Sequence, residues 1–147
     1  MMRPRRRRLG AALAAAAAVA VAGCGGPDVT SARLADAVAG TFAHLYTRQQ
    51  ALLGRAAPPA QASAQCGRSG AGPDAHGAGD DWVCVVLLQL SGPVTQVSYE
   101  VNAKADGCFV ADGPPNVVGG RTLTTPDGRT VLNPLFSFDG CFDTTSA

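Results

Sequence analysis

The chain has 147 residues, enough for one domain with a hydrophobic core. Its formal charge of +1 hides an uneven distribution, because five of the twelve basic residues lie within residues 3–8 and all eleven acidic residues lie after residue 27. Residues 24–147 therefore carry seven basic and eleven acidic residues, a net charge of −4. This balance, without a Lys or Arg cluster, excludes nucleic acid as an expected partner and argues against an electrostatic membrane-binding face.

The N-terminus has the pattern of a secretory signal. Five arginines within residues 3–8 precede residues 9–21, an uncharged run rich in alanine. The run is shorter than the roughly 20 apolar residues that a membrane-spanning helix needs, and Gly25-Gly26-Pro27 ends it. A basic segment, a short apolar segment and small residues in this order predict a removable signal over residues 1–23.

The end of this signal and the next residue, Val21-Ala22-Gly23-Cys24, resemble the lipobox of bacterial lipoproteins. In that family the cysteine receives acyl chains such as palmitate and becomes the first mature residue. The resemblance implies lipid on Cys24, a tether over residues 24–29 and a lipid-anchored location on the extracytoplasmic face of the cell membrane. An ordinary secretory signal that leaves Cys24 unmodified is the alternative. The arginine run leaves both the general secretory and the twin-arginine export routes open.

The other four cysteines predict two disulfides. An even number of cysteines outside the cytoplasm is typical of disulfide pairing, and the absence of any Cys-x-x-Cys pair argues against zinc. Of the three possible pairings, we favour the one that ties the polar loop to the following strand and joins two copies of an Asp-Gly-Cys-Phe pattern. The predicted bonds are Cys66–Cys84 and Cys108–Cys141, and free thiols are the alternative.

A long helix is expected over about residues 30–53. A carboxylate or hydroxyl among residues 28–31 can cap its first turn, and Gly54 is a natural stop. Apolar residues at helical spacing predict one buried stripe, and the remaining polar residues predict a wet face. The stripe is Leu34, Val38, Phe42 and Leu45, and the polar face is Arg33, Asp36, Arg48 and Gln49.

Loop and strand are predicted to follow. Residues 55–80, rich in Ala, Pro, Gly, Ser and Gln, are expected to form a flexible loop with Cys66 as its only fixed point. Residues 82–90 are apolar on both faces, which suits a central strand covered on both sides or by the helix. Residues 95–104 alternate strictly between apolar and polar, which predicts one buried and one wet face.

The C-terminal part adds shorter strands. Asp106-Gly107 turns the chain into residues 108–111, so that three runs form an antiparallel meander. Residues 121–125 and 129–132 flank a Pro-Asp-Gly turn, and Asn133-Pro134 interrupts a last edge strand around Phe136 and Phe138. The predicted fold is α+β: one long N-terminal helix on an antiparallel sheet of four to five strands, within a single domain over residues 30–147.

No set of residues points to catalysis. His44 lies off the apolar stripe, and His76 lies near Asp74, Asp80 and Asp81 without a spacing that fixes a coordination geometry. The single glutamate, Glu100, lies on the predicted wet face. Trp82 is interpreted as packing against the Cys66–Cys84 bond. We therefore expect no catalytic residue, no metal and no cofactor.

The wet face of residues 95–104 is the candidate binding face. We favour a noncatalytic binding or accessory module that presents it to an unknown envelope protein, polymer or small ligand. The alternative is a small extracytoplasmic hydrolase with His44 or His76 as its base. In outline the chain is similar to small secreted lipoproteins of unknown function from high-GC bacteria, a resemblance that carries no activity. The candidate face comprises Gln96, Ser98, Glu100, Asn102 and Lys104.

Lipid attachment at Cys24 is directly testable. We expect the protein to sediment with membranes and to carry lipid mass, and Cys24→Ala to leave the lipid-modified fraction, because two acyl chains anchor a protein stably. Cell fractionation followed by mass spectrometry measures both properties. Unsubstituted protein found entirely in the medium, without lipid mass, would contradict the prediction.

Overall fold

The computed structural model of the chain describes residues 28–57, 59–72 and 74–142. The predicted signal and Cys24 lie outside these residues. Within them no helix is long and apolar enough to cross a membrane. The described elements in chain order are α1 (Ser31–Leu52), β1 (Gln61–Arg68), β2 (Gly79–Gln89), β3 (Thr95–Ala103), β4 (Cys108–Asp112), α2 (Pro115–Val118), β5 (Thr122–Thr124), β6 (Thr130–Leu132) and β7 (Ser137–Cys141).

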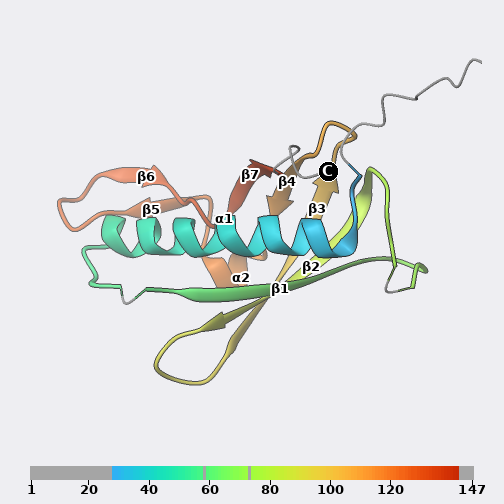
Figure 1. Cartoon of the computed structure of the whole chain (residues 1–147). Coiled ribbons are helices and arrows are strands. Elements are labelled where there is room, and N and C mark those ends of the chain that lie inside the picture. Colours follow the sequence, from blue (N-terminus) through green and yellow to red (C-terminus); the bar gives the residue numbers. More distant parts are fainter. Residues whose placement is uncertain (1–27, 58, 73, 143–147) are drawn as a thin grey trace, which may run out of the picture.

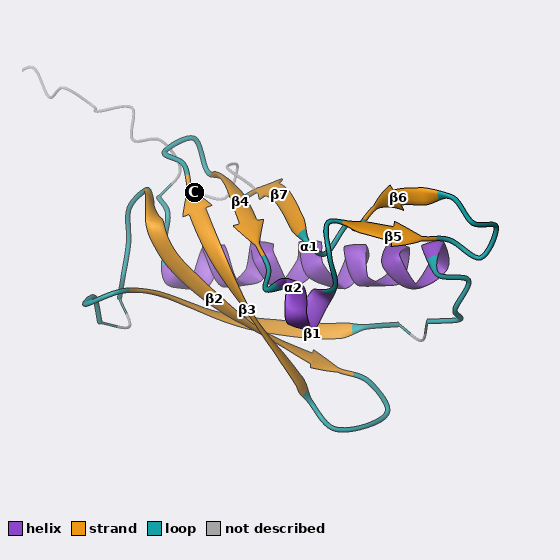
Figure 2. Ribbon diagram, turned by 180° about the vertical axis from the view of Figure 1, so that it is seen from behind, coloured by secondary structure: helices purple, strands orange, loops and turns teal. Residues whose placement is uncertain are grey.

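Five strands form one antiparallel sheet in the order β1-β2-β3-β4-β7, and β5 and β6 form a separate two-stranded sheet. Helix α1 runs alongside β1 and covers one face of the larger sheet, whereas β5 and β6 lie near the C-terminal end of α1 (Figure 1, Figure 2). We call the covered side the inner face and the opposite side the outer face. The predicted α+β class, with one helix on a five-stranded antiparallel sheet, is confirmed; the separate two-stranded sheet was not predicted.

Helix α1 begins and ends where the sequence predicts. Thr30 is extended, and its Oγ1 accepts a hydrogen bond from the backbone N–H of Arg33 (3.3 Å), which caps the first turn. After the helix, Gly54 has a φ of +66°, a conformation that glycine adopts without steric cost. The predicted helix over about residues 30–53 is confirmed. The members of the predicted stripe that are fully buried are Leu34, Val38 and Phe42.

Gln49 departs from the predicted polar face of α1. Its side chain is only 7% exposed, and its Nε2 donates to Asn133 Oδ1 (2.8 Å) and to the Val118 carbonyl (3.3 Å). The assignment was wrong because the segments around α2 and after β6 also pack on the last turns of α1. The helix therefore buries more than one stripe at that end.

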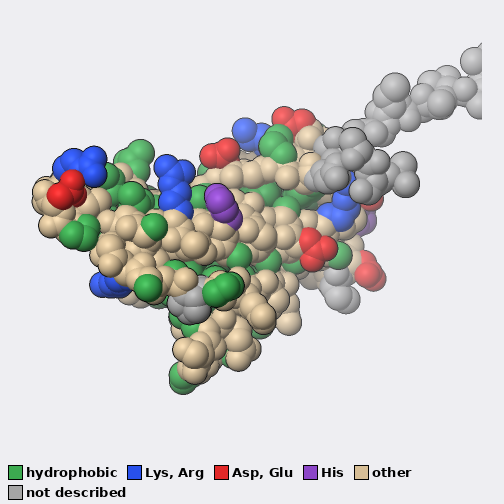
Figure 3. All heavy atoms as spheres, turned by 60° about the vertical axis from the view of Figure 1, so that its left-hand side comes forward, with side chains coloured by type: hydrophobic (Ala, Val, Ile, Leu, Met, Phe, Trp, Pro, Cys, Tyr) green, Lys and Arg blue, Asp and Glu red, His purple; other side chains and the backbone are tan. Residues whose placement is uncertain are grey.

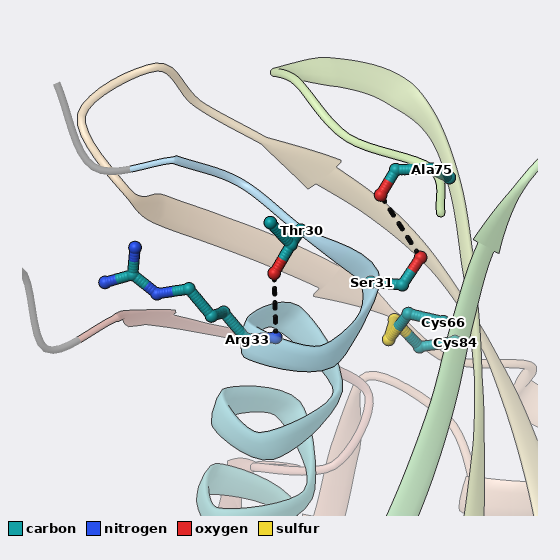
Figure 4. Close-up of a disulfide and its surroundings, with 6 residues drawn as sticks. All are labelled: Thr30, Ser31, Arg33, Cys66, Ala75 and Cys84. Atoms are coloured by element: carbon teal, nitrogen blue, oxygen red, sulfur yellow. Dashed lines mark hydrogen bonds between the residues drawn. A yellow bond between two sulfur atoms is a disulfide. The ribbon is translucent and has the colours of Figure 1, made fainter. Parts of the chain in front are cut away.

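The segment before α1 is bound to the loop between β1 and β2. Gly77 donates its N–H to the Val29 carbonyl (2.8 Å), and the N–H and hydroxyl of Ser31 both donate to the Ala75 carbonyl (3.1 and 3.3 Å). Figure 4 shows the hydrogen bond from the Ser31 hydroxyl to the Ala75 carbonyl, near the disulfide between Cys66 and Cys84. The start of the helix is therefore fixed to a loop that a covalent bond closes.

The prediction of a flexible loop over residues 55–80 is wrong for residues 61–68. They form β1, which pairs with β2 along its whole length at the edge of the sheet. Their small side chains bury little apolar surface, but backbone pairing satisfies their N–H and C=O groups. Ala62 and Ala64 pack against the core, and their small size allows α1 to lie close to the strand.

Strands β2 and β3 show how burial is divided between the two faces. Strand β3 alternates as predicted, with Tyr99 and Val101 buried and Ser98 and Glu100 exposed. Of the two arrangements proposed for β2, coverage by the helix alone is correct. Its inner residues are buried, whereas Val83 on the outer face is 41% exposed.

Tyr99 lies at the centre of an aromatic core. Its ring makes edge-to-face contacts with Phe42 (6.0 Å between centroids) and Phe138 (5.1 Å), the arrangement that aromatic pairs prefer. Its hydroxyl donates to the Leu135 carbonyl (2.9 Å), and burial raises the pKa of that hydroxyl. Tyr99 therefore connects β3 to the segment before β7 and serves packing.

Both predicted disulfides are present, and they lie on opposite faces of the sheet. Cys66 and Cys84 pair across β1 and β2 on the inner face, where Cys84 is fully buried. Cys108 and Cys141 pair across β4 and β7. They lie on the outer face because the neighbouring Phe109 is buried on the inner one.

This difference in burial predicts the order of reduction. A thiolate must reach a sulfur atom to open a disulfide, and Cys141 is exposed whereas Cys84 is not. We expect mild reductant to open Cys108–Cys141 first, as measured by alkylation and peptide mapping over time. In denaturant the two bonds should open at similar rates. Earlier labelling of Cys66 and Cys84 in the folded protein would refute this order.

Candidate binding surfaces

The outer face of the five-stranded sheet carries the predicted binding residues. Four of them lie on β3, Lys104 directly follows that strand, and all five are exposed. Figure 2 views the molecule from this side and shows β2 and β3 in front of α1. The predicted row is therefore on the surface, as strict alternation requires. Its members are Gln96, Ser98, Glu100, Asn102 and Lys104.

An apolar stripe runs beside this row on the outer side of β2. Val83, Val85 and Leu87, which we call the outer apolar stripe, alternate with the buried residues of the strand. Each lies between residues of β1 and β3 that are polar or glycine. The register places Leu87 between Ser63 and Gln96, Val85 between Gln65 and Ser98, and Val83 between Gly67 and Glu100.

Carboxylates gather beside the outer apolar stripe. Glu100 on β3 lies directly opposite Asp112 on β4, and Asp139 on β7 lies opposite Val110. Like charges in opposed positions repel each other, and no ion pair with another described residue compensates Glu100 or Asp112. Lys104 is the only basic residue of the predicted row, and Arg121 lines a pocket together with Asp112.

A second candidate surface is a groove between α1, β7 and the β5–β6 hairpin. It has a volume of about 750 Å³ and includes the apolar side chains of Leu45, Leu132 and Phe138. His44 and Arg48 lie on its α1 side. Figure 3, turned to bring the hairpin forward, shows a histidine exposed on this side of the molecule. The groove is thus mainly apolar, with His44 and Arg48 on its α1 wall and Asp139 on its β7 wall.

Neither histidine is arranged as a general base. His44 is exposed, and no described residue forms a hydrogen bond with its ring. The Nδ1 of His76 lies 3.1 Å from the Asp74 carbonyl, a local backbone contact. Among residues 28–57, 59–72 and 74–142, no three His, Cys, Asp or Glu side chains are grouped as metal ligands. The hydrolase alternative therefore gains no supporting observation.

Trp82 is part of the core. It is 1% exposed, and its Nε1 donates to the Gly77 carbonyl (3.1 Å). The Arg68 guanidinium lies 5.6 Å from the centre of its ring and also pairs with Asp81 (2.7 Å). The hydrogen bond from Arg68 lowers the pKa of the Asp81 carboxyl. Trp82 and Cys84 belong to one buried cluster, which agrees with the packing interpretation.

Asn133 holds the walls of the groove together. Its side chain is 4% exposed. Oδ1 accepts hydrogen bonds from Gln49 Nε2 (2.8 Å) and the Leu135 N–H (3.1 Å), and Nδ2 donates to the carbonyls of Val118 and Gly120 (both 2.9 Å). One buried amide therefore joins α1, the end of α2 and the connection to β7.

One feature of the sequence could have predicted that Gln49 is buried in this network. Gln49 lies four residues after Leu45 and three before Leu52, so it shares a helix side with two leucines. A polar residue in that position is a candidate for a buried hydrogen-bonding role. Asn133 was interpreted only as part of a strand interruption, and nothing local connects it to Gln49.

Comparison of the chain with protein-family models, with curated proteins and with solved structures finds no match.

The Asn133 network predicts a large stability effect. Asn133→Ala leaves several buried groups unpaired, and each such group costs about 1–3 kcal/mol. We expect the free energy of unfolding, measured with urea, to fall by roughly 2–4 kcal/mol. Asn102→Ala, on the exposed side of β3, should change it by less than about 0.5 kcal/mol. Equal unfolding free energies for the two variants would show that the network is not stabilising.

Proposed function

We propose that the protein is a noncatalytic binding module of the cell envelope, anchored by lipid on Cys24 at the extracytoplasmic face of the cell membrane. In this proposal the tether over residues 24–29 leads into α1 as the N-terminal helix of the mature domain. The module docks another protein on the outer face of its sheet. The observation that carries the proposal is the outer apolar stripe, which is left partly exposed beside an exposed polar row.

The stripe has the arrangement of a small interface core. Removing apolar surface from water is favourable by about 25 cal/mol of free energy for each Å². Protein interfaces commonly surround an apolar centre with a polar rim. Here Val85 and Leu87 are half-buried and Val83 is exposed, with Gln, Ser and Glu side chains around them. A protein surface can cover such a stripe and pair with its rim.

The charges beside the stripe favour a partner with basic side chains. Glu100 and Asp112 lie opposite each other, so a Lys or Arg placed between them relieves their repulsion and contributes complementarity. An anionic polymer or an anionic lipid surface is repelled by the same carboxylates. Among the expected partners, a protein with a basic patch therefore fits this face better than an anionic polymer.

The disulfides keep the docking face in one shape. Cys66–Cys84 joins β1 to β2, and Cys108–Cys141 joins β4 to β7. Both edge strands of the sheet, β1 and β7, are therefore joined covalently to their neighbours. A face that is already ordered loses less conformational entropy when a partner binds.

A photoreactive residue in place of Ser98 tests the proposal in intact cells. We expect it to crosslink to one predominant protein, identified by mass spectrometry, and we expect Glu100→Lys to lower the crosslinked yield several-fold through charge repulsion. Asp36→Lys makes the same charge change on the exposed side of α1 and should leave the yield unaltered. Capture of no protein at Ser98, or an equal loss with both substitutions, would reject docking on this face.

A further inference from the structure

Strand β7 leaves one row of backbone groups unused. Among the described strands it is the last of the sheet and pairs only with β4. Gly113 donates its N–H to the Phe136 carbonyl (2.9 Å), and Phe142 donates its N–H to the Gly107 carbonyl (2.8 Å). Since residues of an antiparallel strand alternate in the direction of their N–H and C=O groups, the even-numbered residues of 136–142 face β4.

Ser137 and Asp139 therefore direct their backbone groups away from β4. In the described part of the chain, no backbone hydrogen bond reaches them from that side. Both residues line the groove between β7, α1 and the β5–β6 hairpin. An open strand edge borders a groove that has room for side chains.

The chemistry of the groove matches a polypeptide. Leu132 is 73% exposed at its edge, and Leu45 and Phe138 provide further apolar lining. Arg48 is exposed on the α1 wall and forms no ion pair with a described residue. The groove thus offers an apolar contact and, at Arg48, a positive charge without an ion pair among the described residues, while the Asp139 carboxylate also belongs to its lining.

We propose that this groove binds an extended segment of another protein, which pairs with the edge of β7, packs an apolar side chain against Leu132 and places an acidic side chain at Arg48. Strand addition supplies affinity through backbone hydrogen bonds, and adjacent side-chain sites supply specificity. This site goes beyond the proposed docking on the outer face, because it uses different residues and a different chemistry.

The open edge selects an extended segment over other occupants. A helix satisfies its own backbone groups, and a small apolar ligand has none to offer, so neither pairs with Ser137 and Asp139. β7 has only five residues, which suits a short segment better than a long strand of another sheet. A second copy of this chain is the competing occupant, and the experiment distinguishes it.

Selection from a displayed library of random peptides tests the groove with protein purified from the cells that make it. We expect to select peptides that have alternating apolar residues and an Asp or Glu. Their affinity, measured by fluorescence anisotropy, should be at least tenfold lower for the Arg48→Glu protein. Arg55→Glu reverses a charge outside the groove and should leave affinity unchanged, as should Glu100→Lys on the outer face. Leu132→Ser removes an exposed side chain, so it should lower affinity while circular dichroism shows an intact fold.

The backbone contribution is measured with N-methylated versions of a selected peptide. Methylation of the amides that face β7 should abolish binding, whereas methylation of the alternate amides should not. The proposal is overturned if no peptide is selected, if the Arg48→Glu protein binds like wild type, or if both methylated series bind equally. A dimer that Leu132→Ser converts to a monomer would assign the groove to a second copy and would also overturn it.

Discussion

The packing of α1 on the inner face of the five-stranded sheet is the contact on which the rest of the structure depends. The largest buried side chains lie between these two layers, and their removal from water is the main favourable term in folding. The outer side of β2 and β3 has no corresponding layer in the described residues. The molecule is therefore one-sided, with apolar residues of β2 left at its surface. The two disulfides add to a core that a short chain can build on one face only.

The sequence predicted those elements whose burial repeats at a regular interval. In α1 and β3 one side is buried and the other is wet, so a period of 3.6 or 2 appears directly in the residue order. Strand β1 alternates as well, with Ala62, Ala64 and Cys66 half-buried between exposed polar residues, but its alanines give little apolar signal. Gln49 was misplaced because the segments that cover the end of α1 come from more than sixty residues later in the chain.

The two binding surfaces also differ in how far they could be predicted from the sequence. The outer row follows from local alternation along one strand, so its exposure could be predicted from residues 95–104 alone. The groove brings together Arg48, Leu132 and Ser137 from three separate elements. Its open edge exists because β7 returns to pair with β4 and leaves β6 to pair with β5. No local pattern encodes that choice, whereas the lipid-site prediction at Cys24 needed only four adjacent residues.

The attachment of α1 to the loop between β1 and β2 also defines a path for mechanical load. Tension on the chain before Asp28 first meets the hydrogen bonds that join Val29 and Ser31 to that loop. The loop is closed by Cys66–Cys84, so the tension passes into a covalent ring shared by β1 and β2. Helix α1 begins at Ser31, so these hydrogen bonds divide a load applied at this end between the helix and the disulfide-closed loop.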